Sequence, residues 1–98
     1  QVKVLPISDK YQDYAAQVMQ TLKSMDIRAE IDERQEKIGK KIRDTELEKI
    51  PYMLIVGEKE QEDNQVAVRK QGEGDLGSVA IEDFANRINQ EVADRIAK

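Results

Sequence analysis

Charged side chains that could bind a polar or anionic ligand gather in one stretch of the sequence, residues 34–60. Ammonium and guanidinium groups bind phosphate, and the guanidinium group adds a planar fork of donors. Carboxylates accept hydrogen bonds from polar donors. The charged residues of this stretch include Arg34, Lys37, Lys40, Lys41, Arg43, Lys49, Glu58 and Glu60. The chemistry that these residue types offer is recognition of a ligand.

Two residue types that catalysis commonly requires are absent from the chain, which contains no histidine and no cysteine. Histidine is the most common general base and a frequent metal ligand. Cysteine would be needed for a disulfide framework or a thiolate metal site. We therefore expect that the chain has no catalytic residues, no metal site and no cofactor of its own.

A helix and a strand are predicted to position these charges. Residues 36–48 predict an amphipathic helix with Ile38, Ile42 and Thr45 on one stripe. Another stripe of this helix is polar and contains Lys37, Lys40, Lys41 and Asp44. The continuous apolar run 52–56 then predicts a strand that is covered on both faces. Polar groups at the carboxyl end of such a strand lie where open α/β sheets bind ligands.

The rest of the sequence alternates between strand and helix patterns. Further strands are predicted at residues 2–7, 27–32 and 65–69 and near Val79, and further helices at residues 11–25 and from residue 81 onward. Asp63 and Asn64 predict a hairpin turn between the third and fourth strands. This order predicts an α/β fold with a five-stranded mixed sheet flanked by three helices, in which the first three strands are parallel.

The length and composition predict a single domain over residues 1–98. No apolar run approaches the ~20 residues that would span a membrane, so we expect no membrane partner. The chain begins with Gln1 and shows no signal-peptide pattern, so we interpret it as a fragment of a longer, cytosolic protein. The net charge of −4 argues against sequence-blind binding to polyanions, so a nucleic-acid partner would have to meet a local patch.

Two features favour an ordinary structural interpretation. Residues 72–77 match the pattern G-x-G-x-x-G, but they follow the fourth strand, and Glu73 and Asp75 would repel a pyrophosphate. A glycine-rich turn is the favoured interpretation of this segment. Taken alone, the charges of residues 36–48 and 58–62 are also typical of a solvated surface.

Five strings carry a family resemblance: RQEKIGKKIR at 34–43, IPYMLIVG at 50–57, KE at 59–60, VAVR at 66–69 and DLG at 75–77. Together they resemble the anticodon-binding domain of bacterial threonyl-tRNA synthetase, a class IIa synthetase, and the resemblance covers essentially the whole chain. The prolyl, histidyl and glycyl relatives share the fold and the Ile-Pro-Tyr start of the third strand, whereas EKIGKKIR favours the threonyl enzyme. Gln35 stands where the family usually has asparagine, and its longer side chain can still hydrogen-bond RNA.

The resemblance implies an anticodon-binding-domain fold at the C-terminus of a ligase that joins threonine to its tRNA with ATP. The expected partners are the anticodon loop of the threonine tRNA and the catalytic domain of the same parent chain. ATP, magnesium and zinc would belong to that catalytic domain, so the isolated domain should be inactive. The resemblance also implies a homodimeric parent in the cytoplasm and a monomeric isolated domain.

The resemblance implies a set of site residues as well. Threonine anticodons carry guanine at the second position, and its Watson–Crick edge presents two adjacent donors that one carboxylate can meet. Glu60 is therefore the candidate for reading this base. Arg69 can donate in a fork to a base or a phosphate, and Gln35 can add a hydrogen bond to a base. The residues expected to hold the RNA backbone are Arg34, Lys37, Lys41, Arg43 and Lys49.

The competing interpretation is an anticodon-like α/β domain with a different ligand. Such a sheet could bind a small nucleotide at the point where its strand order reverses, or dock on a protein partner.

Overall fold

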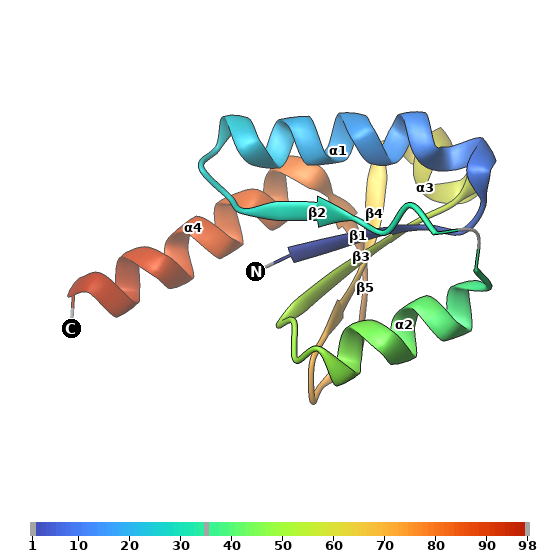
Figure 1. Ribbon diagram of the computed structural model, residues 1–98. Coiled ribbons are helices and arrows are strands. Elements are labelled where there is room, and N and C mark those ends of the chain that lie inside the picture. Colours follow the sequence, from blue (N-terminus) through green and yellow to red (C-terminus); the bar gives the residue numbers. More distant parts are fainter. Residues whose placement is uncertain (1, 35, 98) are drawn as a thin grey trace.

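Five strands form one mixed sheet in the order β2-β1-β3-β4-β5 (Figure 1). The computed structural model describes residues 2–34 and 36–97, with side chains described as far as residue 91. The strands are β1 (Val2–Pro6), β2 (Ala29–Ile31), β3 (Tyr52–Val56), β4 (Gln65–Lys70) and β5 (Gly74–Ala80). Strand β1 pairs in parallel with both β2 and β3, while β4 is antiparallel to β3 and to β5. The predicted five-stranded mixed sheet, with its first three strands parallel, is confirmed.

Helices cover the two faces of the sheet unequally. They are η1 (Asp9–Tyr11, a 3₁₀-helix), α1 (Gln12–Ser24), α2 (Ile38–Leu47), α3 (Glu58–Asp63) and α4 (Ile81–Ala97). Figure 1 shows α1 and α2 on opposite sides of the sheet. Helix α4 shares the face of α1, because Leu22, Leu54 and Phe84 belong to one buried cluster. No helix within the described ranges is long and apolar enough to cross a membrane.

The connection between β3 and β4 is a helix, so the prediction of a hairpin turn at Asp63 and Asn64 is wrong. Helix α3 occupies residues 58–63, which brings the described α-helices to four, whereas three were predicted. Five of its six residues are Glu, Lys or Gln, which are good helix formers, and Glu58 and Glu60 lie in the first turn, where the helix dipole favours carboxylates. Asn64 ends the helix in the left-handed conformation, with φ of 54°.

Helix α2 is 10 residues long and so is shorter than the predicted 36–48. At its start, Lys37 is extended, with φ of −65° and ψ of 145°, so the helix begins one residue later. At its end, Lys49 is left-handed, with φ of 60°, and its N–H donates to Glu46 O at 3.1 Å. The N–H of Ile50 reaches back to Thr45 O at 3.5 Å, which completes a Schellman motif.

The face of α2 that packs on the sheet also differs from the prediction. Thr45 is fully buried as expected, but Ile38 and Ile42 are only half-buried. Lys41, which was predicted on the polar stripe, is buried four residues before Thr45 on the same face.

The buried cluster between the sheet and the α1–α4 layer predicts a strong response to loss of an aromatic side chain. Phe84 is fully buried, and its ring packs edge-on against Tyr52 with centroids 5.4 Å apart. We expect Phe84→Ala to lower the free energy of unfolding by about 3–5 kcal/mol. Urea unfolding followed by circular dichroism measures this change. The control is Leu47→Ala, which removes a side chain from a residue that is 76% exposed and should cost less than about 0.5 kcal/mol. Equal losses in the two variants would contradict this description of the core.

Candidate functional site

The predicted site residues fall into two groups at opposite ends of α2. The carboxyl ends of β1, β2 and β3 share one edge of the sheet, and Arg34 and Glu60 follow two of these ends. Arg69 pairs with Met53 near the other end of β3, and Lys49 directly precedes that strand. A helix of 10 residues is about 15 Å long, so one small ligand cannot touch both groups.

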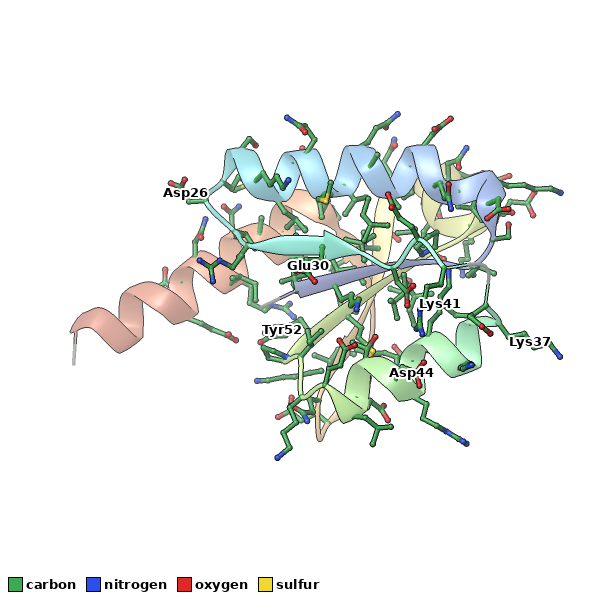
Figure 2. All side chains as sticks on the ribbon, viewed as in Figure 1. Asp26, Glu30, Lys37, Lys41, Asp44 and Tyr52 are labelled. Carbon is green, nitrogen blue, oxygen red and sulfur yellow. The ribbon has the colours of Figure 1, made fainter. Side chains whose placement is uncertain are left out.

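The start of α2 is a positively charged surface. Lys37 and Arg43 are exposed, and neither has an ion-pair partner among the described residues. Together with Lys40, which lies 3.6 Å from Glu36, they line an open hollow of about 770 Å³. In Figure 2, Lys37 points away from the body of the protein.

This helix start also departs from the usual pattern of helix stabilisation. Lys37 occupies the N-cap position and makes no side-chain cap, and the first turn, Ile-Gly-Lys-Lys, contains no carboxylate. The positive end of the helix dipole would ordinarily favour acidic residues here. An added Cβ at Gly39 would meet no atom within 4 Å, so the backbone is open to solvent at this point. The arrangement suits an anion from outside the chain.

Lys41 belongs to the interior, which corrects its predicted role as a contact to the RNA backbone. The residue is 2% exposed. Its Nζ donates to Pro6 O at 3.1 Å and to Asp32 O at 3.3 Å. Figure 2 shows it on the side of α2 that faces the sheet. In this conformation the ammonium group serves backbone carbonyls and is not presented to a ligand.

Arg34 is held by two carboxylates. Its Nε and Nη2 donate to the two carboxylate oxygens of Asp32 at 3.0 and 2.8 Å, and its Nη1 donates to Asp44 Oδ2 at 2.9 Å. The Arg34 backbone N–H also donates to Asp32 Oδ1 at 3.1 Å. These bonds hold the pKa of Asp32 below its ordinary value, although burial acts in the opposite direction. Arg34 therefore orders the chain between β2 and α2, and about half of its side chain remains exposed.

Glu60 lies in the first turn of α3, beyond the carboxyl end of β3, and is half-buried. Its Oε1 would lie 3.3 Å from a Cβ placed on Gly57, so the carboxylate leans over the residue that directly follows β3. The pKa of the nearby Tyr14 hydroxyl is raised, first by burial and then by the negative charge of Glu60. That hydroxyl donates to Gln65 O at 2.7 Å, which leaves the carboxylate of Glu60 without a hydrogen bond from Tyr14.

Arg69 crosses from β4 toward α2. Its Nη2 lies 3.6 Å from Glu46 Oε1, a loose ion pair in which the Arg69 side chain is 30% exposed. Its Nε is buried and has no hydrogen-bond partner among the described residues. Lys49 is exposed in its left-handed position after α2. Gln35, the remaining predicted site residue, lies outside the described residues.

Sequence reasoning missed several residues of this region, above all Asp32, Asp44 and Glu46. A signal existed for Asp32, because an aspartate two residues before a charged loop residue commonly forms a turn with the backbone. Lys40 was assigned to the polar stripe but was not nominated for the site. No signal identified Glu46, because its partner Arg69 is distant in the sequence.

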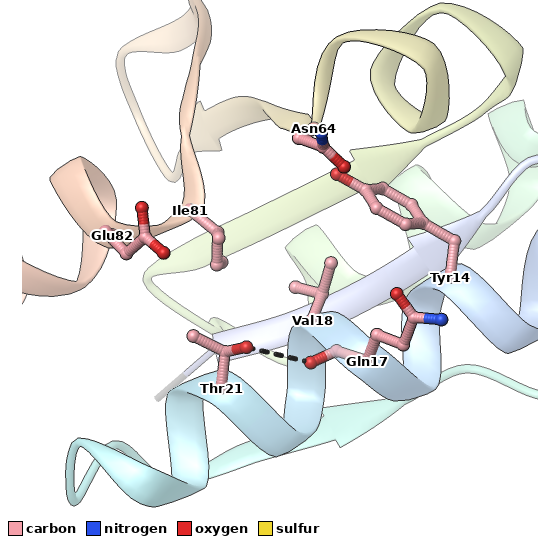
Figure 3. A pocket seen from close by; sticks show the side chains of 7 residues that line it. All are labelled: Tyr14, Gln17, Val18, Thr21, Asn64, Ile81 and Glu82. Carbon is pink, nitrogen blue, oxygen red and sulfur yellow. Dashed lines mark hydrogen bonds between the residues drawn. The ribbon is translucent and has the colours of Figure 1, made fainter.

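A second hollow, of about 360 Å³, lies on the face that carries α1 (Figure 3). It is lined by Tyr14, Gln17, Val18, Thr21, Asn64, Ile81 and Glu82. Figure 3 shows Thr21 bonded to Gln17, where its hydroxyl donates to the backbone oxygen at 3.1 Å. None of these described lining residues is a lysine or an arginine, so the hollow does not favour a nucleotide phosphate. Within the described ranges, no three His, Cys, Asp or Glu side chains come together as ligands for a metal ion.

The Asp32 interactions predict that stability depends on pH. The folded-state pKa is depressed, so Asp32 stabilises the fold above its unfolded-state pKa of about 3.9 and loses this contribution as the pH falls through the folded-state value. We expect Asp32→Asn to lower the free energy of unfolding by about 2–4 kcal/mol at pH 7 and by much less near pH 2. Urea titrations at several pH values measure the difference, with the exposed neighbour Glu33→Gln as control. If Asp32→Asn lowers the free energy of unfolding by the same amount at every pH, the ion pairing is contradicted.

Comparison with solved structures identifies the fold. The RNA-binding domain of threonyl-tRNA synthetase from Cryptosporidium parvum Iowa II superimposes with a TM-score of 0.86 at 28% identity, over 92% of this chain and 23% of that chain. Histidyl-tRNA synthetase from Nostoc sp. PCC 7120 superimposes with a TM-score of 0.85, over 94% of this chain and 22% of that one. At 21% identity, the second likeness concerns the fold alone.

Sequence relatives are more similar. The threonine–tRNA ligase of Phocaeicola vulgatus is 57% identical over all 98 residues, and that of Clostridioides difficile is 54% identical over 95 residues. The chain spans 15% of the length of each of these two relatives. A family model described as "Anticodon binding domain" matches residues 1–91. This match, which covers most of the chain, shows that the chain belongs to the anticodon binding domain family.

Proposed function

We propose that the chain is the anticodon-recognition domain of a threonine–tRNA ligase and binds the anticodon loop of the threonine tRNA. The observation that carries the RNA-binding part is the start of α2, where Lys37, Lys40 and Arg43 surround a helix start that has no side-chain cap and no carboxylate in its first turn. The choice of threonine rests on relatives that are 54–57% identical over at least 97% of the chain.

The start of α2 is suited to hold the phosphate backbone of the loop. The helix dipole and these cations add positive potential at one point of a chain whose net charge is −4. The excess of negative charge over the rest of the surface weakens sequence-blind binding to nucleic acids. Lys37 and Arg43 would therefore position the RNA, and Lys41 is no longer among the proposed contacts.

Glu60 would read the second anticodon base. It lies at the same edge of the sheet as Lys37, so a base that is turned out from the held backbone can reach its carboxylate. Two carboxylate oxygens match the adjacent N1–H and amino donors of guanine, whereas adenine presents an acceptor at N1. Gln35 remains a proposed hydrogen-bonding partner for a base.

Arg69 and Lys49 would meet another part of the loop, about 15 Å away along α2. The loose pair with Glu46 leaves the Arg69 guanidinium able to turn toward a base or a phosphate. Arg34 keeps a smaller proposed role, because its donors are shared with Asp32 and Asp44.

The remaining properties concern the parent protein. We propose a homodimeric cytoplasmic ligase whose catalytic part uses ATP, magnesium and zinc, with this domain supplying recognition and no cofactor site. The described residues offer no cluster that would hold a metal, so no chemical step is assigned to this chain.

Glu60→Gln tests base reading while it preserves side-chain size. The substitution replaces one acceptor with a donor that faces the donors of guanine. We expect a loss of about 1–3 kcal/mol in binding a threonine anticodon stem-loop, with preference for guanine at the second position largely erased. Fluorescence anisotropy titrations with stem-loops that differ only at this base measure both quantities.

Glu62→Gln is the matched control, because it removes one exposed carboxylate from the same helix. It should leave discrimination between bases unchanged. If both variants behave alike, Glu60 is only a solvated surface charge.

Glu46→Gln tests whether Glu46 competes with the RNA for Arg69. Loss of the 3.6 Å ion pair should release the guanidinium and tighten binding by roughly two- to fivefold, since exposed pairs are worth at most about 1 kcal/mol. Glu48→Gln is the control, because it removes the same charge two residues away, where Glu48 pairs with Lys3. It measures how much RNA binding tightens merely because the chain has lost one negative charge. With Arg69→Met as background, the extra gain from Glu46→Gln should vanish, and its persistence would argue against competition.

A further inference from the structure

The ends of β1 and β2 are joined to α2 by one buried ammonium group. Lys41 Nζ donates to Pro6 O, the last residue of β1, and to Asp32 O, directly after β2. A lysine is almost never fully buried unless it is paired, and Lys41 is 2% exposed. Neither of the predicted functions of this sequence segment, a phosphate contact or a solvated charge, accounts for that position.

Lys41 belongs to a balanced set of four charged side chains. The cations are Lys41 and Arg34, and the anions are Asp32 and Asp44. Asp32 is 3% exposed, and its pKa is lowered first by the hydrogen bonds from Arg34 and to a lesser extent by the charge of Lys41. Arg34 then connects Asp32 to Asp44 with bonds of 2.8–3.0 Å. Through these contacts α2 is tied to the end of β2 at two points, one buried and one half-exposed.

The segment between these two ties leads from β2 into α2, and Arg34 and Lys37 are among its described residues. Its direction is set at Arg34 by the side chain of Asp32, which accepts from both the backbone and the guanidinium. At its other end, Lys37 O accepts from the N–H groups of Lys40 and Lys41, so the backbone of Lys41 also supports the start of the helix.

We propose that Lys41 is a positioning residue for RNA binding, and that together with Asp32 and Asp44 it fixes Arg34 and Lys37 relative to the sheet, while Lys41 itself does not touch the RNA. The inference rests on the proposed function. Removal of the ammonium group leaves two buried carbonyls without their donor and Asp32 with one cation fewer. The segment would then lose its fixed placement, and the residues that it presents would reach the RNA less often in the binding geometry.

The salt dependence of binding separates positioning from phosphate contact. Each phosphate contact to single-stranded nucleic acid contributes about 0.7 to the slope of log K against log salt concentration. Lys41→Met keeps the length of the side chain and removes the charge. In the 98-residue chain it should weaken binding of a threonine anticodon stem-loop about tenfold, with an unchanged slope and reduced discrimination between anticodon bases.

Lys37→Met is the matched control, because Lys37 is exposed and lies on the same helix start. It should make the slope shallower by about 0.7 and leave base discrimination unchanged. Thermal unfolding identifies a temperature at which all variants are folded, and binding is measured there. An equally shallow slope for Lys41→Met would overturn the proposal, as would unchanged affinity and discrimination.

Asp44→Asn keeps the proposal testable if Lys41→Met does not fold. Removal of a partly exposed carboxylate should tighten RNA binding if only long-range charge matters. If the network positions the RNA-binding residues, Asp44→Asn should instead weaken RNA binding several-fold, because Arg34 loses one of its two carboxylate partners. Tighter or unchanged binding would overturn the proposal. If the unaltered chain binds no threonine stem-loop, the proposed function fails, and failure of the variants alone counts only against the role of Lys41.

Discussion

The hydrogen bonds from Lys41 to the carbonyls of Pro6 and Asp32 are the interaction on which this surface depends. Parallel strands end with carbonyl groups that need donors, and here one side chain from α2 supplies them at two neighbouring strands. The buried carboxylate of Asp32 is compensated mainly by Arg34, which it holds in place, and the same ammonium group adds a further positive charge. Packing of the helix, closure of the sheet edge and the course of the connecting segment are therefore coupled at one point.

Local stability and recognition are in conflict at the start of α2. Its amino end begins on an extended lysine with no side-chain cap, and its first turn adds cations where the dipole favours anions. At the opposite end the Schellman motif at Lys49 satisfies the carbonyls of Thr45 and Glu46, although the last turn contains Asp44 and Glu46 and no basic residue. Departures from local rules tend to occur at functional positions, and both ends of α2 carry candidates for RNA contact.

The five strands and the parallel direction of the first three could be predicted because apolar periodicity and the βαβ sequence order determine them, and β3 was located to the residue. The roles of Lys40 and Lys41 could not, because these adjacent identical residues differ only by about 100° in helical phase, and a rotation of α2 by one residue changes which one faces the sheet. Helix α3 was missed because a six-residue helix and a charged turn have similar compositions. The grouping of Glu60 and Arg69 depended on register: both follow the third strand in sequence, yet the antiparallel return of β4 carries Arg69 to the far end of α2.

In the proposed complex, α2 would act as a spacer of fixed length between Lys37, which precedes it, and Lys49, which follows it. The domain would then recognise the separation of two points on an RNA loop in addition to the identity of a base. A loop with one nucleotide more or fewer, but with the same anticodon, would present its backbone and its base at the wrong distance. Insertion of a residue into α2 would have a comparable effect from the protein side, since each residue adds 1.5 Å and turns the helix by about 100°. The length of this helix is therefore itself a constraint on which RNA can bind.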